Sequence, residues 1–318
     1  MKVLTVCKYK EALPHNMAPF IREQAEALSR QGVTVRFYLV KGRGVRGYLK
    51  EISKLKKVIK TFNPDVVHAH YGLCGLLANL QRKVPVVTTY HGSDINDPKV
   101  RGLSRIAIRL SAHNIFVSKR QLESGKSGKS HTIIPCGINL ENYPEVGKSE
   151  ARRMMGLDSA KKYILFAGAF DNPVKNHTLA KAAVDLVPSA ELIELKGYDR
   201  QQVALLMNAA DCFLMTSHTE GSPQVIKEAM ACGCPIVSVD VGDVREVISN
   251  SEGCFIASGN AADIAGKIEM ALKFEGRTKG RERIEQLGLT SARIAQTIID
   301  IYRAQKLRNG SSCQLMKI

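Results

Sequence analysis

Glu220 and Glu228 are two acidic residues whose spacing suits a single elongated ligand. The apolar run at residues 210–215 predicts a short strand before them. Pro223 fits an early position of a helix that continues to Cys232. Glu220 then lies in the loop between strand and helix, and Glu228 lies about two helical turns further on, roughly 12 Å along the axis. Both carboxylates can therefore face one ligand.

The start of this predicted helix lies between the two carboxylates. Gly221 and Ser222 turn the chain there, and the free N–H groups at a helix N-terminus suit a phosphate. A ligand with a sugar at one end, a diphosphate in the middle and a ribose at the other end fits this layout. The alternative is an ordinary amphipathic helix that carries two acidic residues on its surface.

The stretch from Glu220 to Gly233 resembles the signature of the family 4 glycosyltransferases, which are retaining enzymes of the GT-B fold. In that signature seven residues separate two glutamates, Gly and Pro follow the first, and Glu-Ala-Met-Ala surrounds the second. The segments 233–237 and 242–246 continue the resemblance. It implies an α/β fold with two doubly wound, Rossmann-like domains and a cleft between them.

The first half of the chain carries further segments that resemble this family. Residues 64–70 are similar to the strand that precedes the acceptor pocket, and residues 84–94 are similar to its strand and His-Gly-x-Asp loop. In the family the His of this loop contacts the transferred sugar near the reacting carbon, so the resemblance implies that role for His91. A structural His is the alternative. Asp94 either contacts acceptor or phosphate, or caps the next turn.

Two departures from the family pattern affect the phosphate and acceptor sites. Residues 166–176 resemble a loop in which an Arg and a Lys neutralise the donor diphosphate; Lys175 matches the Lys, but Ala169 stands at the Arg position. One cation is therefore missing or comes from elsewhere. The candidates from the first half are Lys8, Lys10 and Arg22. The family also has a Gly-Gly loop after the first strand, whereas residues 8–19 contain no glycine, so the acceptor side is matched less well.

The resemblance implies a division of roles on the donor side. Glu228 binds the ribose hydroxyls, while Glu220 holds the sugar hydroxyls and supports positive charge at the anomeric carbon. Lys175 and the N–H groups around Gly221 and Ser222 stabilise the leaving diphosphate, with Pro223 in the same turn. No side chain is needed as a covalent nucleophile. Closure of the two domains would exclude water.

Positive charge is concentrated in the first half of the chain. The net charge is +16 overall, and residues 1–150 hold 25 Lys and Arg against 11 Asp and Glu. The densest part, residues 41–60, alternates basic and apolar residues at helical spacing. Such a helix can lie on an anionic membrane surface or pack its apolar stripe on its own domain, and both can hold at once. Nucleic acid is not expected as a partner, because aromatic residues are scarce and no nucleic-acid-binding module is visible.

Strand and helix signals alternate along both halves, which predicts mainly parallel sheets. The length of 318 residues fits about two domains. We predict an acceptor-binding domain at residues 1–145 and a nucleotide-sugar-binding domain at residues 146–318. In the family the last helix, here 291–305, often returns to the first domain. Residues 139–160 are expected to form an irregular linker, and residues 306–318 a loose polar tail.

Other sites are less well supported by the sequence. His68 and His70 alternate along a strand and could share a metal, but no carboxylate or Cys partner is evident, and GT-B enzymes generally need no metal. Residues 42–47 satisfy Gly-x-Gly-x-x-Gly but follow the second strand, so a flexible basic loop is favoured over a dinucleotide site. The eight cysteines include no Cys-x-x-Cys pair and are expected to be reduced thiols. No apolar run reaches the ~20 residues of a membrane span.

The resemblance therefore implies a retaining, hexosyl-type glycosyltransferase without a cofactor, since the nucleotide-diphosphate sugar is a substrate. A UDP-sugar is the expected donor and GDP-mannose the next. The expected acceptor is a lipid-linked saccharide or another saccharide in surface polysaccharide or glycolipid biosynthesis. The expected location is cytoplasmic, with peripheral contact at the inner face of the plasma membrane. Alternatives are another GT-B enzyme such as a nucleotide-sugar epimerase or hydrolase, a non-catalytic polyanion or membrane binder, and, more distantly, a nicotinamide dehydrogenase.

Overall fold

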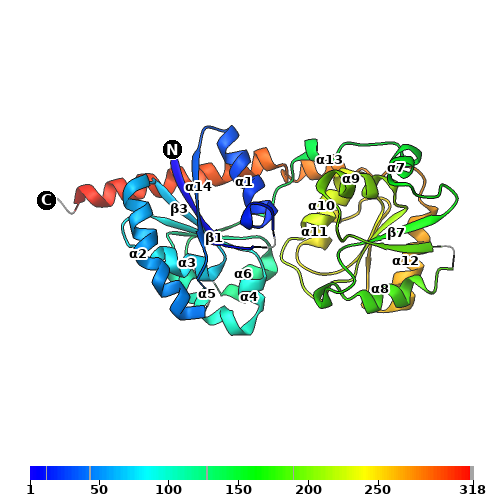
Figure 1. Cartoon of the computed structure of the whole chain (residues 1–318), viewed down its shortest axis with the longest axis horizontal. Helices are drawn as coiled ribbons and strands as arrows, with labels where there is room; N and C mark the ends of the chain where they lie inside the picture. The colour runs from blue at the N-terminus through cyan, green and yellow to red at the C-terminus, as the bar shows by residue number, and fades with distance from the viewer. Residues whose placement is uncertain (12, 43, 127, 189, 316–318) are drawn as a thin grey trace. The chain divides into compact units, whose positions relative to one another are not determined.

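The chain forms two compact units, each built around one parallel sheet. The computed structural model describes residues 1–11, 13–42, 44–126, 128–188 and 190–315. Unit 1 comprises Met1–Gly137 together with the chain from Ser291 onward, and unit 2 comprises Ile138–Thr290. In each unit helices cover both faces of the sheet (Figure 1). Within the described residues no helix is both long and apolar enough to cross a membrane.

Unit 1 contains a six-stranded parallel sheet in the order β2-β1-β3-β4-β5-β6. The strands are β1 (Lys2–Lys8), β2 (Thr34–Val40), β3 (Val66–His70), β4 (Val86–Tyr90), β5 (His113–Phe116) and β6 (His131–Ile133). Strands β3, β4 and β5 are buried along their whole length, as expected for a parallel sheet covered on both faces. In this register His68 of β3 lies between Thr5 of β1 and Val87 of β4.

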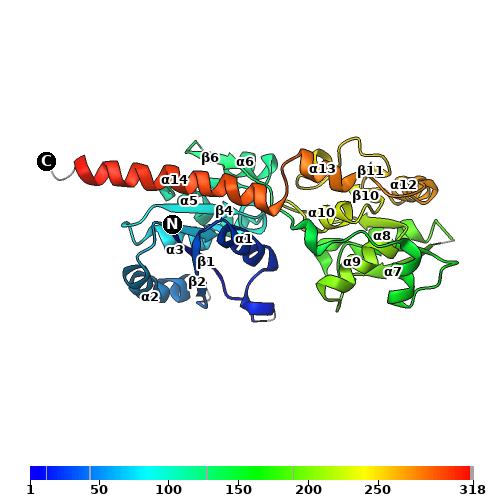
Figure 2. The same ribbon diagram turned by 90° about the horizontal axis from the view of Figure 1, so that it is seen from above.

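The helices of unit 1 divide between the two faces of its sheet. They are α1 (Pro19–Arg30), α2 (Gly44–Phe62), α3 (Gly72–Asn79), α4 (Ser93–Asn96), α5 (Pro98–Leu110), α6 (Lys119–Gly125) and α14 (Ser291–Leu315), with a short 3-10 turn η1 (Pro14–Asn16). Figure 2 shows α14 running along unit 1 beside α1. The Gln31 side chain at the end of α1 donates to the carbonyl of Ala292 at 2.7 Å.

Helix α2 packs its apolar stripe on the sheet of unit 1. Leu55 and Ile59 are buried in a cluster with Leu4, Val6 and Val67 of the sheet. The lysines of the opposite face are exposed. Of the two interpretations of this basic helix, packing on its own domain is therefore confirmed, and the basic face remains open to solvent.

Helix α2 also begins earlier than the sequence suggested. Residues 42–47 are expected to form a flexible basic loop, but the helix starts at Gly44, so that prediction is wrong for most of the segment. Arg43 lies outside the described residues. The helix can extend because residues 46–49 continue the amphipathic pattern of the residues that follow.

Unit 2 contains a five-stranded parallel sheet in the order β11-β10-β9-β7-β8. The strands are β7 (Lys162–Phe166), β8 (Ala190–Glu194), β9 (Cys212–Met215), β10 (Ile236–Val239) and β11 (Cys254–Ala257). The helices are α7 (Lys148–Met155), α8 (His177–Val184), α9 (Arg200–Ala209), α10 (Gln224–Ala231), α11 (Val244–Ile248), α12 (Ala261–Lys273) and α13 (Gly280–Gln286), with 3-10 turns η2 (Leu140–Asn142) and η3 (Pro173–Lys175). Local sequence determines where α9 begins, because Asp199 and Gln202 form a capping box at its start.

The division between the units falls at Gly137 and Ile138, eight residues before the predicted boundary at 145. Segment 138–146 stays with unit 2 because two arginines hold its carbonyl groups. Arg281 donates to the carbonyls of Leu140 and Tyr143, at 3.2 and 2.9 Å, and Arg277 donates to the carbonyl of Val146. The expected irregular linker also contains η2 and α7.

The last helix belongs to unit 1 by its contacts and is longer than predicted. Helix α14 extends to Leu315, so the prediction of a loose tail from Lys306 is wrong for residues 306–315; residues 316–318 lie outside the described part. Ile298 and Tyr302 are buried, and Lys306 forms an ion pair with Asp65 at 2.9 Å. Of these contacts, the Lys306–Asp65 pair lies beyond the predicted end at residue 305.

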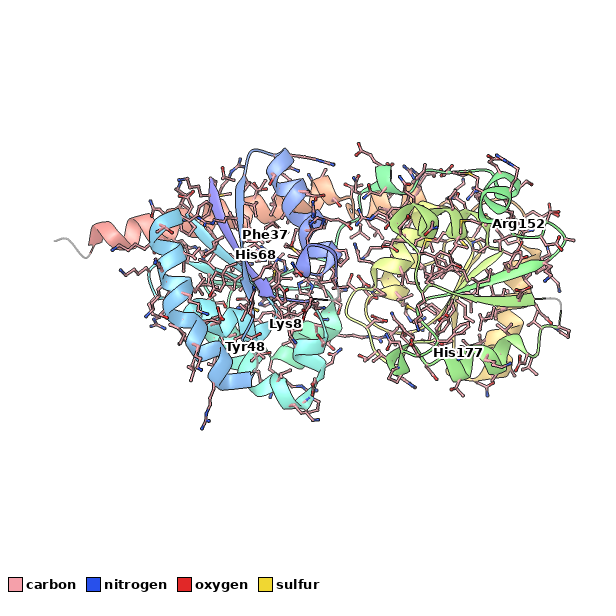
Figure 3. All side chains as sticks on the ribbon, in the orientation of Figure 1. Lys8, Phe37, Tyr48, His68, Arg152 and His177 are labelled. Atoms are coloured by element: carbon pink, nitrogen blue, oxygen red, sulfur yellow. The ribbon has the colours of Figure 1, made fainter. Side chains whose placement is uncertain are left out.

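A buried ion pair closes the amino edge of the unit 2 sheet. Arg152 of α7, labelled in Figure 3, lies with an Nη atom 2.6 Å from a carboxylate oxygen of Asp211. The same oxygen accepts from the backbone N–H of Tyr163 at 2.8 Å, and Arg152 also donates to the carbonyls of Ala209 and Ser159. Both side chains are less than one tenth exposed. The pair therefore joins α7 to the starts of β7 and β9.

Replacing Arg152 by Met should destabilise the protein strongly, because it removes the buried cation of Asp211 and the donor to the carbonyls of Ala209 and Ser159. The half-exposed Lys148 and Lys162, 3.1 and 3.9 Å from Asp211, are then the cations left beside the buried carboxylate. We expect a loss of about 3–5 kcal/mol in the free energy of unfolding, measured by urea denaturation. Adding Asp211→Asn to the same chain should restore part of this loss, since the buried charge is then removed. A loss below about 1 kcal/mol in Arg152→Met would contradict the prediction.

Candidate active site

Lys175 and Glu220 meet in unit 2 at the carboxyl edge of its sheet. The Nζ atom of Lys175 lies 2.7 Å from a carboxylate oxygen of Glu220, and each side chain is about one fifth exposed (19% and 18%). The loops that carry them are joined: the Thr216 hydroxyl donates to the carbonyls of Lys175 and Asn176, at 2.9 and 3.0 Å. The structure thus brings together two residues that the sequence predicted for one donor site.

Local sequence explains how Lys175 is placed. The Asn172 side chain accepts from the backbone N–H of Val174 at 3.1 Å and caps the 3-10 turn η3, which ends at Lys175. The stem of the lysine packs over Gly168, where a Cβ atom would lie 2.8 Å from its Cγ atom. A residue with a side chain at position 168 would therefore displace Lys175.

Glu228 lies in α10, which follows Glu220 and the turn at Gly221 and Ser222. Pro223 occupies the N-cap position, one residue earlier than predicted, and the helix begins at Gln224. The side chains of Glu220 and Glu228 are both half-buried and reach solvent. Gly233, with φ of +64°, ends the helix as the sequence indicates.

A buried polar group beneath this turn was not predicted from the sequence. Lys227 is fully buried, and its Nζ atom donates to the Ser222 hydroxyl at 2.5 Å and lies 3.6 Å from Asp243. The Ser222 hydroxyl in turn donates to the Asp243 carboxylate at 2.6 Å. The sequence does indicate this burial, because Lys227 shares a helix face with the apolar residues Met230 and Ala231. A lysine at such a position needs a buried partner.

The Asp243 carboxylate is held in an apolar setting with incomplete hydrogen bonding. Burial raises its pKa, while the Lys227 ammonium and the Ser222 hydroxyl act in the opposite direction. One carboxylate oxygen is buried without a hydrogen-bond partner among the described residues. Asp243 thus depends on Lys227 and Ser222 to remain charged inside unit 2.

In unit 1, Asp94 organises the loop that carries His91. Its carboxylate accepts from the backbone N–H groups of His91 and Gly92, both at 3.0 Å, and from that of Gly72 at 2.9 Å. Burial raises the pKa of Asp94 to about 6, although these N–H groups favour the ionised form. The structure therefore places Asp94 inside α4 as a residue that organises the His91 loop, while Asp97 caps the next helix.

His91 is the outermost member of a stack of three imidazoles. Its Nε2 atom is hydrogen-bonded to Nδ1 of His70 at 2.9 Å, and the His70 ring stacks on that of His68 at 4.4 Å. His68, labelled in Figure 3, is bonded through Nδ1 to the Tyr302 hydroxyl at 2.5 Å and through Nε2 to Thr89 at 2.8 Å. Helix α14 therefore supports the inner end of the stack.

Burial keeps the imidazoles of this stack neutral. It lowers the pKa of His68 and of His91 to about 3, and lowers that of His70 well below its usual value. The hydrogen-bond partners of His68 are hydroxyls, His70 and His91 are bonded to each other, and His91 is also bonded through Nδ1 to the sulfur of Cys136 at 4.0 Å. Within the described residues no group of three or more His, Cys, Asp or Glu side chains is arranged to hold a metal ion.

The basic residues proposed from the first half do not form one group. Burial and the nearby Lys8 lower the pKa of Lys10, whose ammonium lies 5.8 Å from the centre of the Tyr71 ring. Lys10 also contributes to the lowered pKa of His91, so it belongs to the surroundings of that residue. Arg22 instead pairs with Glu26 on α1 at 2.7 Å. The structure thus relates Lys10 to His91 in unit 1, whereas Arg22 is engaged with a glutamate of its own helix.

Two family models match this chain, one in each unit. Residues 17–142 match the model described as Glycosyltransferase Family 4, and residues 189–288 match the one described as Glycosyl transferases group 1. TuaC of Bacillus subtilis strain 168, a glycosyltransferase provisionally assigned to teichuronic acid biosynthesis, is 26% identical over 281 residues, covering 75% of this chain and 71% of TuaC. The N-acetyl-alpha-D-glucosaminyl L-malate synthase of Bacillus anthracis is 22% identical over 296 residues, covering 80% and 75%.

Solved structures establish the fold. The sucrose-phosphate synthase of Thermosynechococcus elongatus is similar with a TM-score of 0.83 and 18% identity, over 95% of this chain and 98% of its own. HepE of Anabaena, solved in complex with UDP, has a TM-score of 0.74 and 14% identity over 96% and 100%. The predicted class, an α/β fold of the two-domain GT-B type, is confirmed.

The neutral imidazoles predict acid lability. Because the pKa of His68 lies near 3 in the folded protein and near 6.5 in the unfolded chain, the unfolded state takes up the proton first as pH falls. The stability contributed by a neutral His68 is present above pH 6.5 and is lost as the pH falls below it, by about 2 kcal/mol at pH 5.

Urea denaturation of the wild type and of His68→Gln at pH 7.5 and pH 5.0 tests this. The loss of stability between the two pH values should be smaller in the variant by about 2 kcal/mol, since one buried imidazole no longer titrates on unfolding. Equal losses in the two proteins would show that His68 does not contribute to the pH dependence.

Proposed function

This chain belongs to the family 4, group 1 glycosyltransferases, and from that premise we propose that it moves a sugar from a nucleotide-diphosphate sugar to an anionic, lipid-linked or saccharide acceptor with retention of configuration. The observation that carries the donor half of this proposal is the Lys175–Glu220 pair beside the start of the helix that holds Glu228. Cation, carboxylates and helix N-terminus together suit a sugar, a diphosphate and a ribose.

The roles proposed for the donor side follow from charge. The Lys175 ammonium would meet the diphosphate and stabilise the negative charge that develops as it leaves. Glu220, released from Lys175 or shared with it, would accept hydrogen bonds from the sugar hydroxyls and stabilise positive charge at the anomeric carbon. Glu228 would accept two hydrogen bonds from the ribose. A UDP-sugar is the favoured donor, supported by the UDP bound in the solved HepE structures.

Ser222 would contribute its backbone N–H rather than its side chain. Its hydroxyl has one proton, which it donates to Asp243, and it also accepts from Lys227. Together with the N–H of Gly221, the backbone of this turn is the part that would contact the diphosphate. Because Ala169 stands at the position of the family's Arg, Lys175 is the cation that the loop at residues 166–176 supplies.

The acceptor side of the proposal rests on unit 1. His91 would contact the transferred sugar as a neutral imidazole, with Lys10 and Lys8 nearby as cations for an acceptor phosphate. The excess of basic residues in positions 1–150 and the exposed lysines of α2 suit a pyrophosphate-linked lipid at an anionic membrane surface. The role would be in surface polysaccharide or glycolipid assembly, as the name of the Bacillus subtilis relative suggests for that protein.

Nucleotide binding tests the donor site directly. In a thermal-shift panel of UDP, GDP, ADP and their sugars, one nucleotide should stabilise the wild type, by about 2.7 kcal/mol at 100 times its Kd. Glu228→Ala should lose most of this shift, because the ribose hydroxyls lose their acceptor. Glu269→Ala on α12, an exposed glutamate of the same unit, is the matched control and should keep it. Absence of a shift with every nucleotide would favour a non-catalytic binder.

The stereochemistry of the product tests the assignment of a retaining transferase. We expect NMR of the product to show the same anomeric configuration as the donor sugar. Glu220→Gln should lower kcat by about 10²–10³, because it removes a charge that stabilises the transition state. An inverted product, or turnover of the nucleotide sugar without any acceptor, would overturn the proposal; the second result would favour an epimerase or a hydrolase.

A further inference from the structure

The buried group of Lys227, Ser222 and Asp243 holds the turn at the start of α10 from inside unit 2. Lys227 has no exposed surface, and Asp243 is 6% exposed. Taking an ammonium and a carboxylate out of water costs several kcal/mol per ion, and their attraction offsets this only with good geometry and further hydrogen bonds. Apolar residues of similar volume often stabilise a fold equally well. Stability alone therefore explains this group poorly.

Ser222 is held from two sides by this group. Its hydroxyl accepts from the Lys227 ammonium at 2.5 Å and donates to the Asp243 carboxylate at 2.6 Å, so its hydrogen-bonding capacity is largely used inside the protein. Lys227 lies on α10 and Asp243 directly precedes α11. The side chain of Ser222 is thus attached to two separate elements, both of which follow the turn in sequence.

Backbone packing fixes the same turn. Gly242 has φ of +61°, and a Cβ atom there would lie 2.7 Å from the carbonyl oxygen of Gly221. Only glycine allows this approach, because any other residue would be strained and would push the turn away. Gly242 and Asp243 therefore act on two successive residues of the turn, one through the backbone and the other through a side chain.

We propose that Lys227 and Asp243 are positioning residues, which hold the Gly221–Ser222 turn in the conformation that binds the donor diphosphate. They do not touch the ligand; they act through the hydroxyl of Ser222. This inference rests on the proposed function, since it assigns the support of the same donor site. It predicts that loss of the group weakens diphosphate binding selectively, while contacts with the nucleoside are kept.

The test separates positioning from stability. The variant Lys227→Met/Asp243→Leu removes both charges together, so neither is left buried alone, and should keep a free energy of unfolding close to that of the wild type. Calorimetric titration with UDP and with uridine, or with GDP and guanosine if the wild type prefers them, should show diphosphate affinity reduced at least tenfold and nucleoside affinity unchanged. The matched control is Arg152→Met/Asp211→Asn, which removes the buried pair at the opposite edge of the same sheet. It should not reduce the affinity for the nucleoside diphosphate relative to the affinity for the nucleoside.

Ser222→Ala provides a second variant should the double substitution fail to fold. It removes only the hydroxyl, leaves Lys227 and Asp243 able to pair, and should show the same selective loss of diphosphate affinity. A well-folded double variant, or a folded Ser222→Ala protein, with wild-type affinity for the diphosphate would overturn the inference alone. A wild type that binds no nucleotide would instead overturn the proposed function, and this inference with it.

Discussion

The proposed donor site depends on one constraint: charged groups at the carboxyl edge of the unit 2 sheet must be held close together while remaining open to a ligand. The Lys175–Glu220 pair satisfies this constraint, because its two charged groups lie 2.7 Å apart while each side chain remains about one fifth exposed. Pairing lowers the cost of keeping either charge partly buried before a ligand arrives. The joined loops at Thr216 and Lys175 limit how far the two can separate.

Both units support their loops with a buried carboxylate that is not itself exposed to ligand. Asp94 accepts from three backbone N–H groups beneath the His91 loop, and Asp243 accepts from the hydroxyl of Ser222 beneath the Gly221–Ser222 turn. In each case the loop follows a buried parallel strand, whose backbone groups are already paired. The His91 loop lacks a ladder partner, so the buried Asp94 supplies the missing acceptor for its backbone N–H groups, whereas Asp243 holds its turn through a side-chain hydroxyl.

The sequence predicted what depends on local pattern. Buried strands such as Val66–His70 are apolar runs, and the strand, turn and helix around Glu220 follow from Pro223 and Gly233. It did not predict what depends on contacts distant in sequence: the division at Gly137 is set by arginines near residue 280, and the length of α14 by its packing on unit 1. Lys227 was overlooked because its partner Asp243 lies on another loop, although its place on an apolar helix face was visible.

The neutral state of His91 bears on the chemistry proposed for it. A protonated imidazole would repel the positive charge that develops at an anomeric carbon, whereas a neutral one can hydrogen-bond a sugar hydroxyl without that cost. Burial and the nearby Lys10 both oppose protonation of His91. His70 is hydrogen-bonded to its Nε2 atom, and Nδ1 makes a long hydrogen bond of 4.0 Å with the sulfur of Cys136. A sugar hydroxyl that meets Nδ1 would therefore replace the bond with Cys136. Burial thus keeps His91 neutral, and its bond to His70 leaves Nδ1, with its weak sulfur partner, as the nitrogen open to exchange.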